Sequence, residues 1–272
     1  MVHAALVGCS AADDSINLWT LSTSVNPDHL GLSKLSDTLK GHTGTIASIS
    51  YLAGRGVLAT ASFDRTIKLW RLRTEATGEA KHTAALQATL TGHTDGINGI
   101  VYLADKGVVA STGDDNTLRL WALSDDGCSG NLSATLQLPS DSGMSLEYIA
   151  NGKDVLAVGS YDTTITLWQL SADGLSASLA STLTGAHSRA VYSMAYLQKE
   201  NVLASGGGDH VINLWTLATD GRSAVLSKTL TGHTDAVTSL VYGLVSCCLG
   251  VCLLLILIPP LCDACASKRL RK

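Results

Sequence analysis

Residues 41–70 read GHTGTIASISYLAGRGVLATASFDRTIKLW, and this stretch decides the fold because its landmarks recur along the chain. Within it, Asp64 follows His42 by twenty-two residues, and Trp70 follows Asp64 by six. The same spacing of His, Asp and Trp recurs in residues 93–121 and 187–215. A constant spacing is typical of a tandem array of one structural unit. Function therefore has to be sought on an array and not in a single catalytic pocket.

The tryptophans extend the array beyond these three units. They lie 51, 51, 47 and 47 residues apart and are Trp19, Trp70, Trp121, Trp168 and Trp215. Each has an Asp six positions upstream and alternating residues before it, such as 66–70, a pattern that predicts a strand buried on one face. We predict four antiparallel strands per unit, named a to d, which in the second unit are residues 46–52, 57–60, 66–70 and 86–90.

These features resemble the WD-repeat β-propeller family, in which a Gly-His pair opens the unit and a Trp ends the third strand. The resemblance covers residues 1–242. It implies an all-β fold, a β-propeller of four-stranded antiparallel blades, with units centred on the tryptophans. The Asp that often follows the Trp in this family is absent, and the residues in its place are Thr20, Arg71, Ala122, Gln169 and Thr216.

The resemblance also implies a buried, hydrogen-bonded tetrad in three units. Strand alternation places a Ser or Thr, ten residues before the Trp, on the same face as that Trp. The implied tetrads are His42/Thr60/Asp64/Trp70, His93/Ser111/Asp115/Trp121 and His187/Ser205/Asp209/Trp215. A buried carboxylate needs donors and a buried indole N–H needs an acceptor, so such a network would pin the b–c turn to the entry of the next blade.

His, Asp and Ser side chains together also suggest a catalytic triad. An enzyme needs one constellation in one cleft, whereas this group recurs at structural spacing, so we expect no catalytic residues and no enzyme. The fourth unit has Val158 at the hydroxyl position and no His before Asp162, and the first unit has Cys9 at the hydroxyl position. We expect these two blades to be the weaker ones.

Composition sets further bounds. A chain of 272 residues suits one domain of this type, and a net charge of −4 argues against a nucleic-acid partner. Cys262 and Cys265 form a Cys-x-x-Cys pair, but no second pair is placed to complete a zinc site, so we expect no metal and no cofactor. Residues 1–10 lack the basic start of a signal peptide, so we expect a cytoplasmic protein.

The two ends of the array leave its closure open. Three strands, four complete units and a final strand at 237–242 would make about five blades if that strand joined the first unit. The alternative is an incomplete propeller, an open arc cut from a larger one, which would expose strand edges.

Residues 243–272 form a hydrophobic, Cys-rich tail with a basic end. No charged residue lies between Asp235 and Asp263, a run of twenty-seven residues, and an apolar stretch of about 20 can span a bilayer. Three interpretations stay open. Residues 243–261 could anchor the protein in a membrane, the tail could be a terminus produced by reading through an exon boundary, or it could pack on the propeller.

Recognition is expected on the rim shared by the b–c turns and the His-bearing d–a loops. Shared residues serve the scaffold, so the candidates are residues that differ between units: Phe63, Arg65, Tyr161, Arg189 and His210. Exposed aromatic and arginine side chains dominate the energy of interfaces; the alternative is that each covers the neighbouring blade. The resemblance implies a non-catalytic interaction scaffold or adaptor that binds other proteins. A membrane-tethered adaptor is the alternative.

Overall fold

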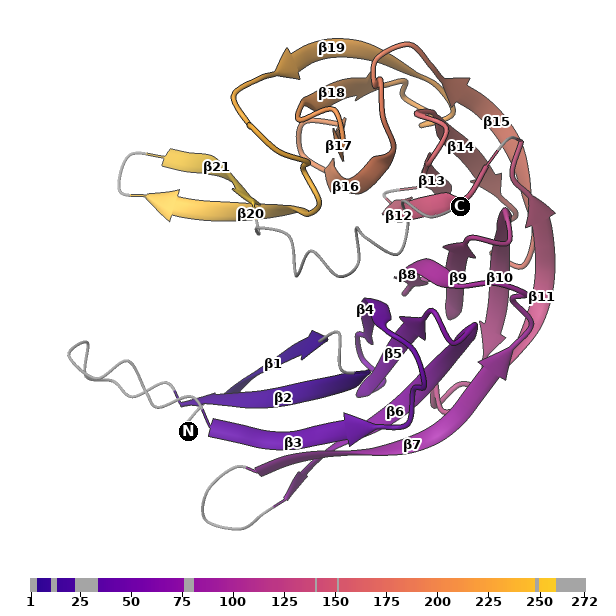
Figure 1. Cartoon of the computed structure of the whole chain (residues 1–272), viewed down its shortest axis with the longest axis vertical. Helices are drawn as coiled ribbons and strands as arrows, with labels where there is room; N and C mark the ends of the chain where they lie inside the picture. Colours follow the sequence, from indigo (N-terminus) through magenta and orange to yellow (C-terminus); the bar gives the residue numbers. More distant parts are fainter. Residues whose placement is uncertain are drawn as a thin grey trace.

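The computed structural model describes residues 4–10, 14–22, 34–75, 81–139, 141–150, 152–247 and 250–257. Every regular element in these residues is a β-strand, and the strands form four sheets of four, one of three and one of two. We name the first five sheets blades A to E in chain order, and the last one the terminal hairpin. The predicted all-β propeller architecture with about five blades is confirmed, and the blades follow one another along an arc (Figure 1).

Each blade is a meander of strands in chain order. Blade A contains β1 (Ala4–Ser10), β2 (Ser15–Ser22) and β3 (Lys34–Lys40). Blade B contains β4 (Ile46–Leu52), β5 (Val57–Ser62), β6 (Thr66–Glu75) and β7 (Lys81–Thr91). Blade C contains β8 (Ile97–Leu103), β9 (Val108–Gly113), β10 (Thr117–Leu123) and β11 (Gly130–Gln137). Blade D contains β12 (Gly143–Ile149), β13 (Val155–Ser160), β14 (Ile165–Leu170) and β15 (Ala177–Leu183). Blade E contains β16 (Val191–Leu197), β17 (Val202–Gly207), β18 (Ile212–Leu217) and β19 (Ala224–Leu230). The terminal hairpin contains β20 (Leu240–Cys247) and β21 (Gly250–Leu257).

The hydrophobic core lies between the blades. Strands β5, β9 and β13 are buried at every residue, because both of their faces contact a neighbouring sheet. Four apolar clusters each join two consecutive blades, as Leu52 and Val57 of blade B do with Val109 and Trp121 of blade C, and a fifth joins blade E to Leu240 of the terminal hairpin. The outer strands are mostly exposed, as the pattern of β15 shows. Stability therefore comes from stacking each blade on the next, as in other repeat arrays.

Basic residues of the a–b turns also link neighbouring blades, on the rim opposite the His-bearing loops. The guanidinium carbon of Arg55 lies 5.6 Å from the centre of the Tyr102 ring in blade C. The Lys153 ammonium lies 5.5 Å from the centre of the Tyr196 ring in blade E. Lys106 forms a 3.0 Å salt bridge to blade D. These contacts hold consecutive blades in a fixed relation to one another.

The ends of the array form an open arc in this structure. β1 pairs with β2, and β20 pairs with β21, so the described strands contain no pairing between the first blade and the last strands. The five-blade closure that was one alternative is therefore absent from the described residues. The predicted boundary between residues 242 and 243 falls inside β20.

Part of the predicted membrane segment belongs to the terminal hairpin. β20 and β21 are antiparallel, with Tyr242 opposite Leu255. Residues 248, 249 and 258–261 of that segment lie outside the described residues. Within the described part of the chain, no helix is long and apolar enough to cross a membrane.

Candidate functional site

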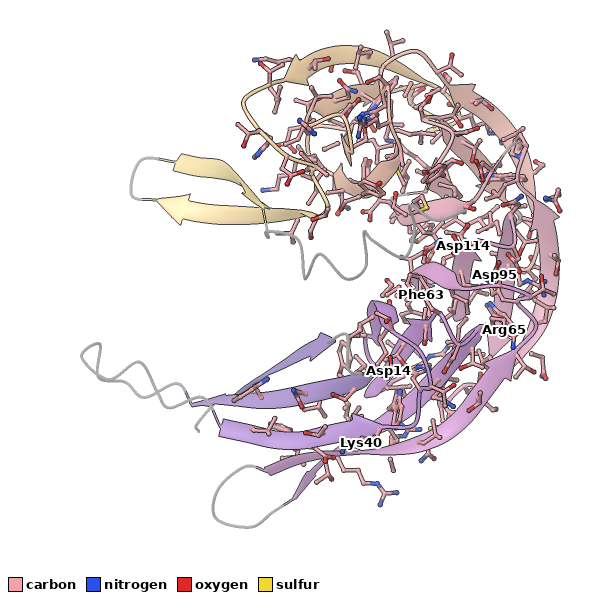
Figure 2. All side chains as sticks on the ribbon, viewed as in Figure 1. Asp14, Lys40, Phe63, Arg65, Asp95 and Asp114 are labelled. Atoms are coloured by element: carbon pink, nitrogen blue, oxygen red, sulfur yellow. The ribbon has the colours of Figure 1, made fainter. Side chains whose placement is uncertain are left out.

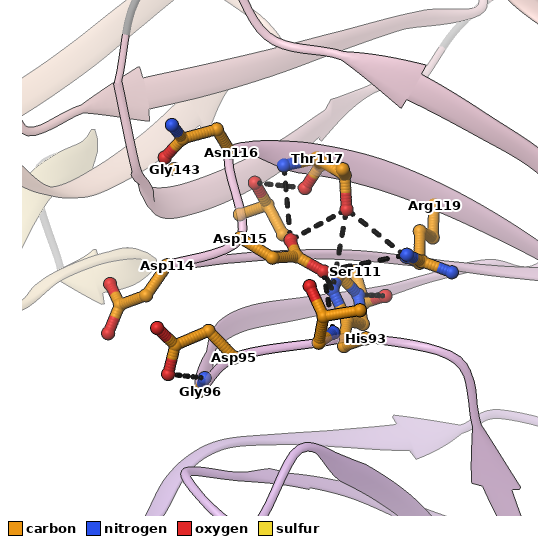
Figure 3. A network of polar contacts seen from close by, with 12 residues as sticks. His93, Asp95, Gly96, Ser111, Asp114, Asp115, Asn116, Thr117, Arg119 and Gly143 are labelled. Atoms are coloured by element: carbon orange, nitrogen blue, oxygen red, sulfur yellow. Dashed lines mark hydrogen bonds and ion pairs between the residues drawn. The ribbon is translucent and has the colours of Figure 1, made fainter.

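Blade C brings the four members of one tetrad together, and Figure 3 shows three of them, His93, Ser111 and Asp115. His93 lies in the loop before β8, Ser111 on β9, Asp115 in the β9–β10 turn and Trp121 on β10. His93 Nδ1 lies 2.8 Å from the Asp115 carboxylate, and His93 Nε2 lies 2.8 Å from the Ser111 hydroxyl. The indole N–H of Trp121 donates to the same hydroxyl at 2.9 Å. A loop, a turn and two strands are thereby joined by one chain of hydrogen bonds.

Blade B repeats this geometry. His42 Nδ1 lies 2.7 Å from the Asp64 carboxylate, and His42 Nε2 lies 2.8 Å from Thr60 Oγ1. The Trp70 indole N–H donates to Thr60 Oγ1 at 3.0 Å. The hydroxyl-bearing residues of all three tetrads are fully buried, with exposures of 0% for Thr60, Ser111 and Ser205.

Blade E has the third tetrad. His187 Nδ1 lies 3.0 Å from one Asp209 carboxylate oxygen, and His187 Nε2 lies 2.8 Å from the Ser205 hydroxyl. The Trp215 indole N–H donates to that hydroxyl at 2.9 Å. The structure thus brings together every member of the three sets that the spacing defines.

The pKa shifts in blade B favour a neutral His42 beside an ionised Asp64. Burial lowers the pKa of His42, and the opposing effect of Asp64 does not restore it. Burial also raises the pKa of Asp64, but hydrogen bonds from Thr66, His42 and the Thr43 N–H outweigh burial and leave it below its ordinary value. A neutral imidazole beside a carboxylate donates from Nδ1, so Nε2 accepts the Thr60 O–H.

This direction decides what the tetrad can do chemically. The Thr60 proton is held by His42, and its oxygen accepts the Trp70 indole N–H, so the hydroxyl uses both functions inside the protein. A nucleophile needs an exposed oxygen beside its base. In these three tetrads the oxygen is buried, so the arrangement stabilises the blade and offers no site for a substrate.

Threonines next to the tetrads were missed by the sequence reasoning. Thr66 Oγ1 donates to Asp64 at 2.6 Å, and Thr117 Oγ1 donates to Asp115 at 2.7 Å. In blade C the Arg119 guanidinium also lies 3.6 Å from the Asp115 carboxylate. A Thr two residues after the Asp was the available signal, and Thr164 holds the same position in blade D. Asp64 and Asp115 thus each accept a hydrogen bond from a threonine hydroxyl in addition to their contact with the tetrad histidine.

In blade D the indole N–H of the Trp finds a different hydrogen-bond acceptor. Val158 is buried at the hydroxyl position, but the Trp168 indole N–H donates to Thr166 Oγ1 at 2.9 Å. Thr166 lies two residues before the Trp on β14 and is itself buried. The indole N–H therefore keeps an acceptor, although two tetrad members are missing. In blade A, the side chains of Cys9 and Asp13 lie outside the described residues.

Phe63 is placed differently from the expectation of a solvent-facing ring. It is half-buried, and a Cβ added to Gly96 would lie 2.8 Å from its Cδ1 atom. The ring therefore packs on the loop that enters blade C, close to Asp95 and Asp114 (Figure 2). This contact is the covering role that was the alternative for Phe63.

The other rim candidates divide into exposed and half-buried residues. Arg65 and Arg189 are exposed, Tyr161 is 45% exposed, and His210 is half-buried. Arg65 and His210 also share a backbone requirement, because both have a positive φ, 69° and 67°. The equivalent residues of blades C and D are Asn116 at 58° and Thr163 at 81°. This turn position thus demands a left-handed conformation in every one of these blades.

No metal centre accompanies the tetrads. Across the residues that the structure describes, no group of three or more His, Cys, Asp or Glu side chains is arranged to hold a metal ion.

Comparison with known proteins matches three units of the array. Residues 33–71, 84–122 and 178–216 fit the family model described as WD domain, G-beta repeat. Each matched segment contains one complete tetrad.

Curated proteins from fungi show the same kind of similarity. Nuclear distribution protein PAC1 of Arthroderma benhamiae is 30% identical over 127 residues, 44% of this chain and 24% of that protein. The CCR4-associated factor 4 homolog of Candida glabrata is 28% identical over 128 residues, 46% of this chain and 20% of that protein. Nuclear distribution protein nudF of Aspergillus flavus is 30% identical over 99 residues, 36% of this chain and 20% of that protein. The chain thus covers a quarter or less of each relative.

Proposed function

The chain is a WD-repeat protein, and from this we propose that it acts as a non-catalytic scaffold that binds other proteins. The observation that carries the proposal is that the His-bearing rim combines two kinds of residue. Tetrad residues recur between blades and are buried, whereas the residues beside them differ between blades and include the exposed Arg65, Tyr161 and Arg189. Rigid turns that present different side chains suit recognition, because little ordering is needed on binding.

Tyr161 and Arg189 are the strongest contact candidates on this rim. Tyr161 lies in the β13–β14 turn, where its N–H donates to Ser142 O at 2.9 Å, so the backbone below the exposed ring is held in place. Arg189 lies in the loop between blades D and E, where its neighbour Ala190 accepts a hydrogen bond from Gly208 N at 2.9 Å. Aromatic and arginine side chains on a fixed backbone are the residues that most often dominate binding energy.

Affinity purification with mass spectrometry tests the scaffold. The tagged full chain should capture a defined set of proteins, and the Tyr161→Ala/Arg189→Ala double variant should lose part of that set. The matched control is Asp125→Ala/Lys199→Ala, two exposed positions on the opposite rim. Equal capture by all three proteins, at equal thermal stability, would reject this rim as the binding surface.

A membrane-tethered adaptor is the second candidate function. It is favoured by one observation, the twenty-seven uncharged residues between Asp235 and Asp263. This second proposal also includes the predicted domain division, in which residues 1–242 form the propeller and residues 243–272 form a separate tail. Carbonate washing of membranes is the test, because an anchor would stay in the membrane fraction and a cytoplasmic scaffold would be released.

A further inference from the structure

The inner strands of neighbouring blades are joined by hydrogen bonds from side chain to backbone. Between blades B and C, the Ser50 hydroxyl accepts the Tyr102 N–H at 3.1 Å. Between blades D and E, the Glu147 carboxyl accepts the Tyr196 N–H at 3.0 Å. Ser50 and Glu147 hold equivalent positions, each one residue before the inner-strand tyrosine of its own blade. We call the contact between β12 and β16 the D/E seam. The D/E seam has the titratable carboxyl of Glu147 at the position where the contact between blades B and C has the hydroxyl of Ser50.

Glu147 has no counter-charge on the strands that pack against β12. These strands are β8, β9, β13 and β16. Their titratable side chains are Tyr102 on β8 and Tyr192 and Tyr196 on β16, while β9 and β13 have none. On β12 itself the other titratable group is Tyr148. Lys153 also reaches this seam, but it bonds the hydroxyl end of Tyr196 at 3.2 Å, away from the backbone N–H that Glu147 contacts.

The protonation state of Glu147 consequently affects how well the seam closes. Burial raises the pKa of Glu147 to about 7, against a smaller opposing effect of the Tyr196 N–H. The Glu147 side chain is half-buried, and an ionised carboxylate that is partly withdrawn from water without a positive partner favours any conformation that exposes it further. The neutral acid keeps an acceptor oxygen for the Tyr196 N–H and adds no buried charge.

We propose that Glu147 is a proton-dependent latch that closes the D/E seam when protonated and loosens it when ionised. The seam between blades B and C has Ser50 at this position and is expected to stay closed across the same pH range. As the pH rises toward neutrality, blade E separates from blade D more often than the other blades separate from one another. The latch thus divides the arc at a defined place, between β12 and β16.

Hydrogen exchange of the full chain tests the latch. The readout is the exchange of peptides that contain β16, corrected for the intrinsic effect of pH on amide exchange. A shift from the ordinary value of 4.5 to about 7 predicts that the opening equilibrium increases by about 30-fold between pH 5.5 and 8.5. Glu147→Gln, which keeps the acceptor oxygen, and Glu147→Ser, which copies Ser50, should each abolish this increase. Asp125→Asn removes an exposed carboxylate and should behave like the wild type.

Two results would overturn the latch. One is the same pH-dependent increase in Glu147→Gln as in the wild type. The other comes from direct NMR titration of the side-chain carboxyl carbon in the unmodified protein, a measurement that does not depend on the variants folding. A titration midpoint below pH 5 would remove the physical basis of the latch.

Discussion

Replacing Thr60 by Val tests how the tetrads stabilise the array. Valine keeps the branched shape of threonine, so the substitution removes the hydroxyl and leaves no large cavity. Thr60 is fully buried, and its oxygen lies 3.0 Å from Trp70 Nε1 and 2.8 Å from His42 Nε2. The variant therefore leaves an indole N–H and an imidazole nitrogen without partners in a place that water does not reach.

The magnitude follows from these two groups. Each buried polar group left unpaired costs about 1–3 kcal/mol, so we expect Thr60→Val, which leaves two of them, to lower the free energy of unfolding by about 2–6 kcal/mol. Urea unfolding followed by tryptophan fluorescence measures the change, with the slope of the transition compared between proteins. Thr135→Val is the matched control, because Thr135 is exposed on β11, and its effect should stay within about 0.5 kcal/mol.

Blade D supplies a rescue for the same experiment. There, Thr166 accepts the Trp168 indole N–H from two residues upstream, and Lys68 holds that position in blade B. Adding Lys68→Thr to Thr60→Val should recover about 1–2 kcal/mol, because the indole regains an acceptor while His42 Nε2 stays unpaired. The Lys68→Thr single variant completes a double-mutant cycle. A loss below about 0.5 kcal/mol in Thr60→Val would refute the view that the tetrad hydrogen bonds stabilise the blade.

Three further predictions concern single side chains. Thr166→Val should cost about 1–3 kcal/mol in urea unfolding, because it removes the acceptor of the Trp168 indole N–H; an unchanged midpoint would contradict this. Thr163→Asn should raise the free energy of unfolding by about 1 kcal/mol, because a β-branched residue is strained at a φ of 81° and asparagine is not; Arg65→Asn should gain less, and equal gains would contradict the argument. His42→Gln should flatten the loss of stability between pH 7 and 5, because burial lowers the pKa of His42 and the unfolded chain takes up a proton that the folded chain refuses. His233→Gln, at an exposed histidine, is the control and should keep the wild-type slope.

Features inside one unit could be predicted from the sequence. The strand order and the sets such as His93, Ser111, Asp115 and Trp121 depend on residue separations that repeat, and a β-strand has a regular period of two. Once the unit is recognised, these separations determine which side chains share a face. The four strands of blade B lie where the alternation places them, although β5, β6 and β7 are longer than expected.

Contacts between units were harder to predict from the sequence, because they join residues that lie far apart in the chain and belong to different units. The packing of Phe63 on Gly96 depends on how the β5–β6 turn meets the loop before β8, and no repeated spacing in the sequence predicts this contact. Thr166 was missed because the residue two positions before the Trp is variable, with Lys68 in blade B and Arg119 in blade C. Glu147 was missed because an isolated carboxyl in a strand has no motif, and its effect comes from its contact with the Tyr196 N–H of β16.

The titratable groups of the tetrads and of the D/E seam act on stability in opposite directions. His42 and Asp64 have folded pKa values below their ordinary values, so the stability they contribute is present at neutral pH and is lost as the pH falls. Glu147 has a folded pKa raised from 4.5 to about 7, so its contribution is complete below pH 4.5 and is lost as the pH rises to 7. That shift corresponds to about 3 kcal/mol.

Between pH 4.5 and 6.5 the loss from Glu147 on raising the pH and the loss from His42 on lowering it oppose each other. The wild-type protein should therefore be most stable in mildly acidic solution. Glu147→Gln removes the loss at higher pH and leaves the effects of His42 and Asp64, so its stability maximum should move above pH 6.5. Free energies of unfolding measured from pH 4.5 to 8.5 would locate both maxima. A wild-type maximum above pH 8 would show that Glu147 is ionised at no cost in the folded chain, and the opposition between seam and tetrad would then not exist.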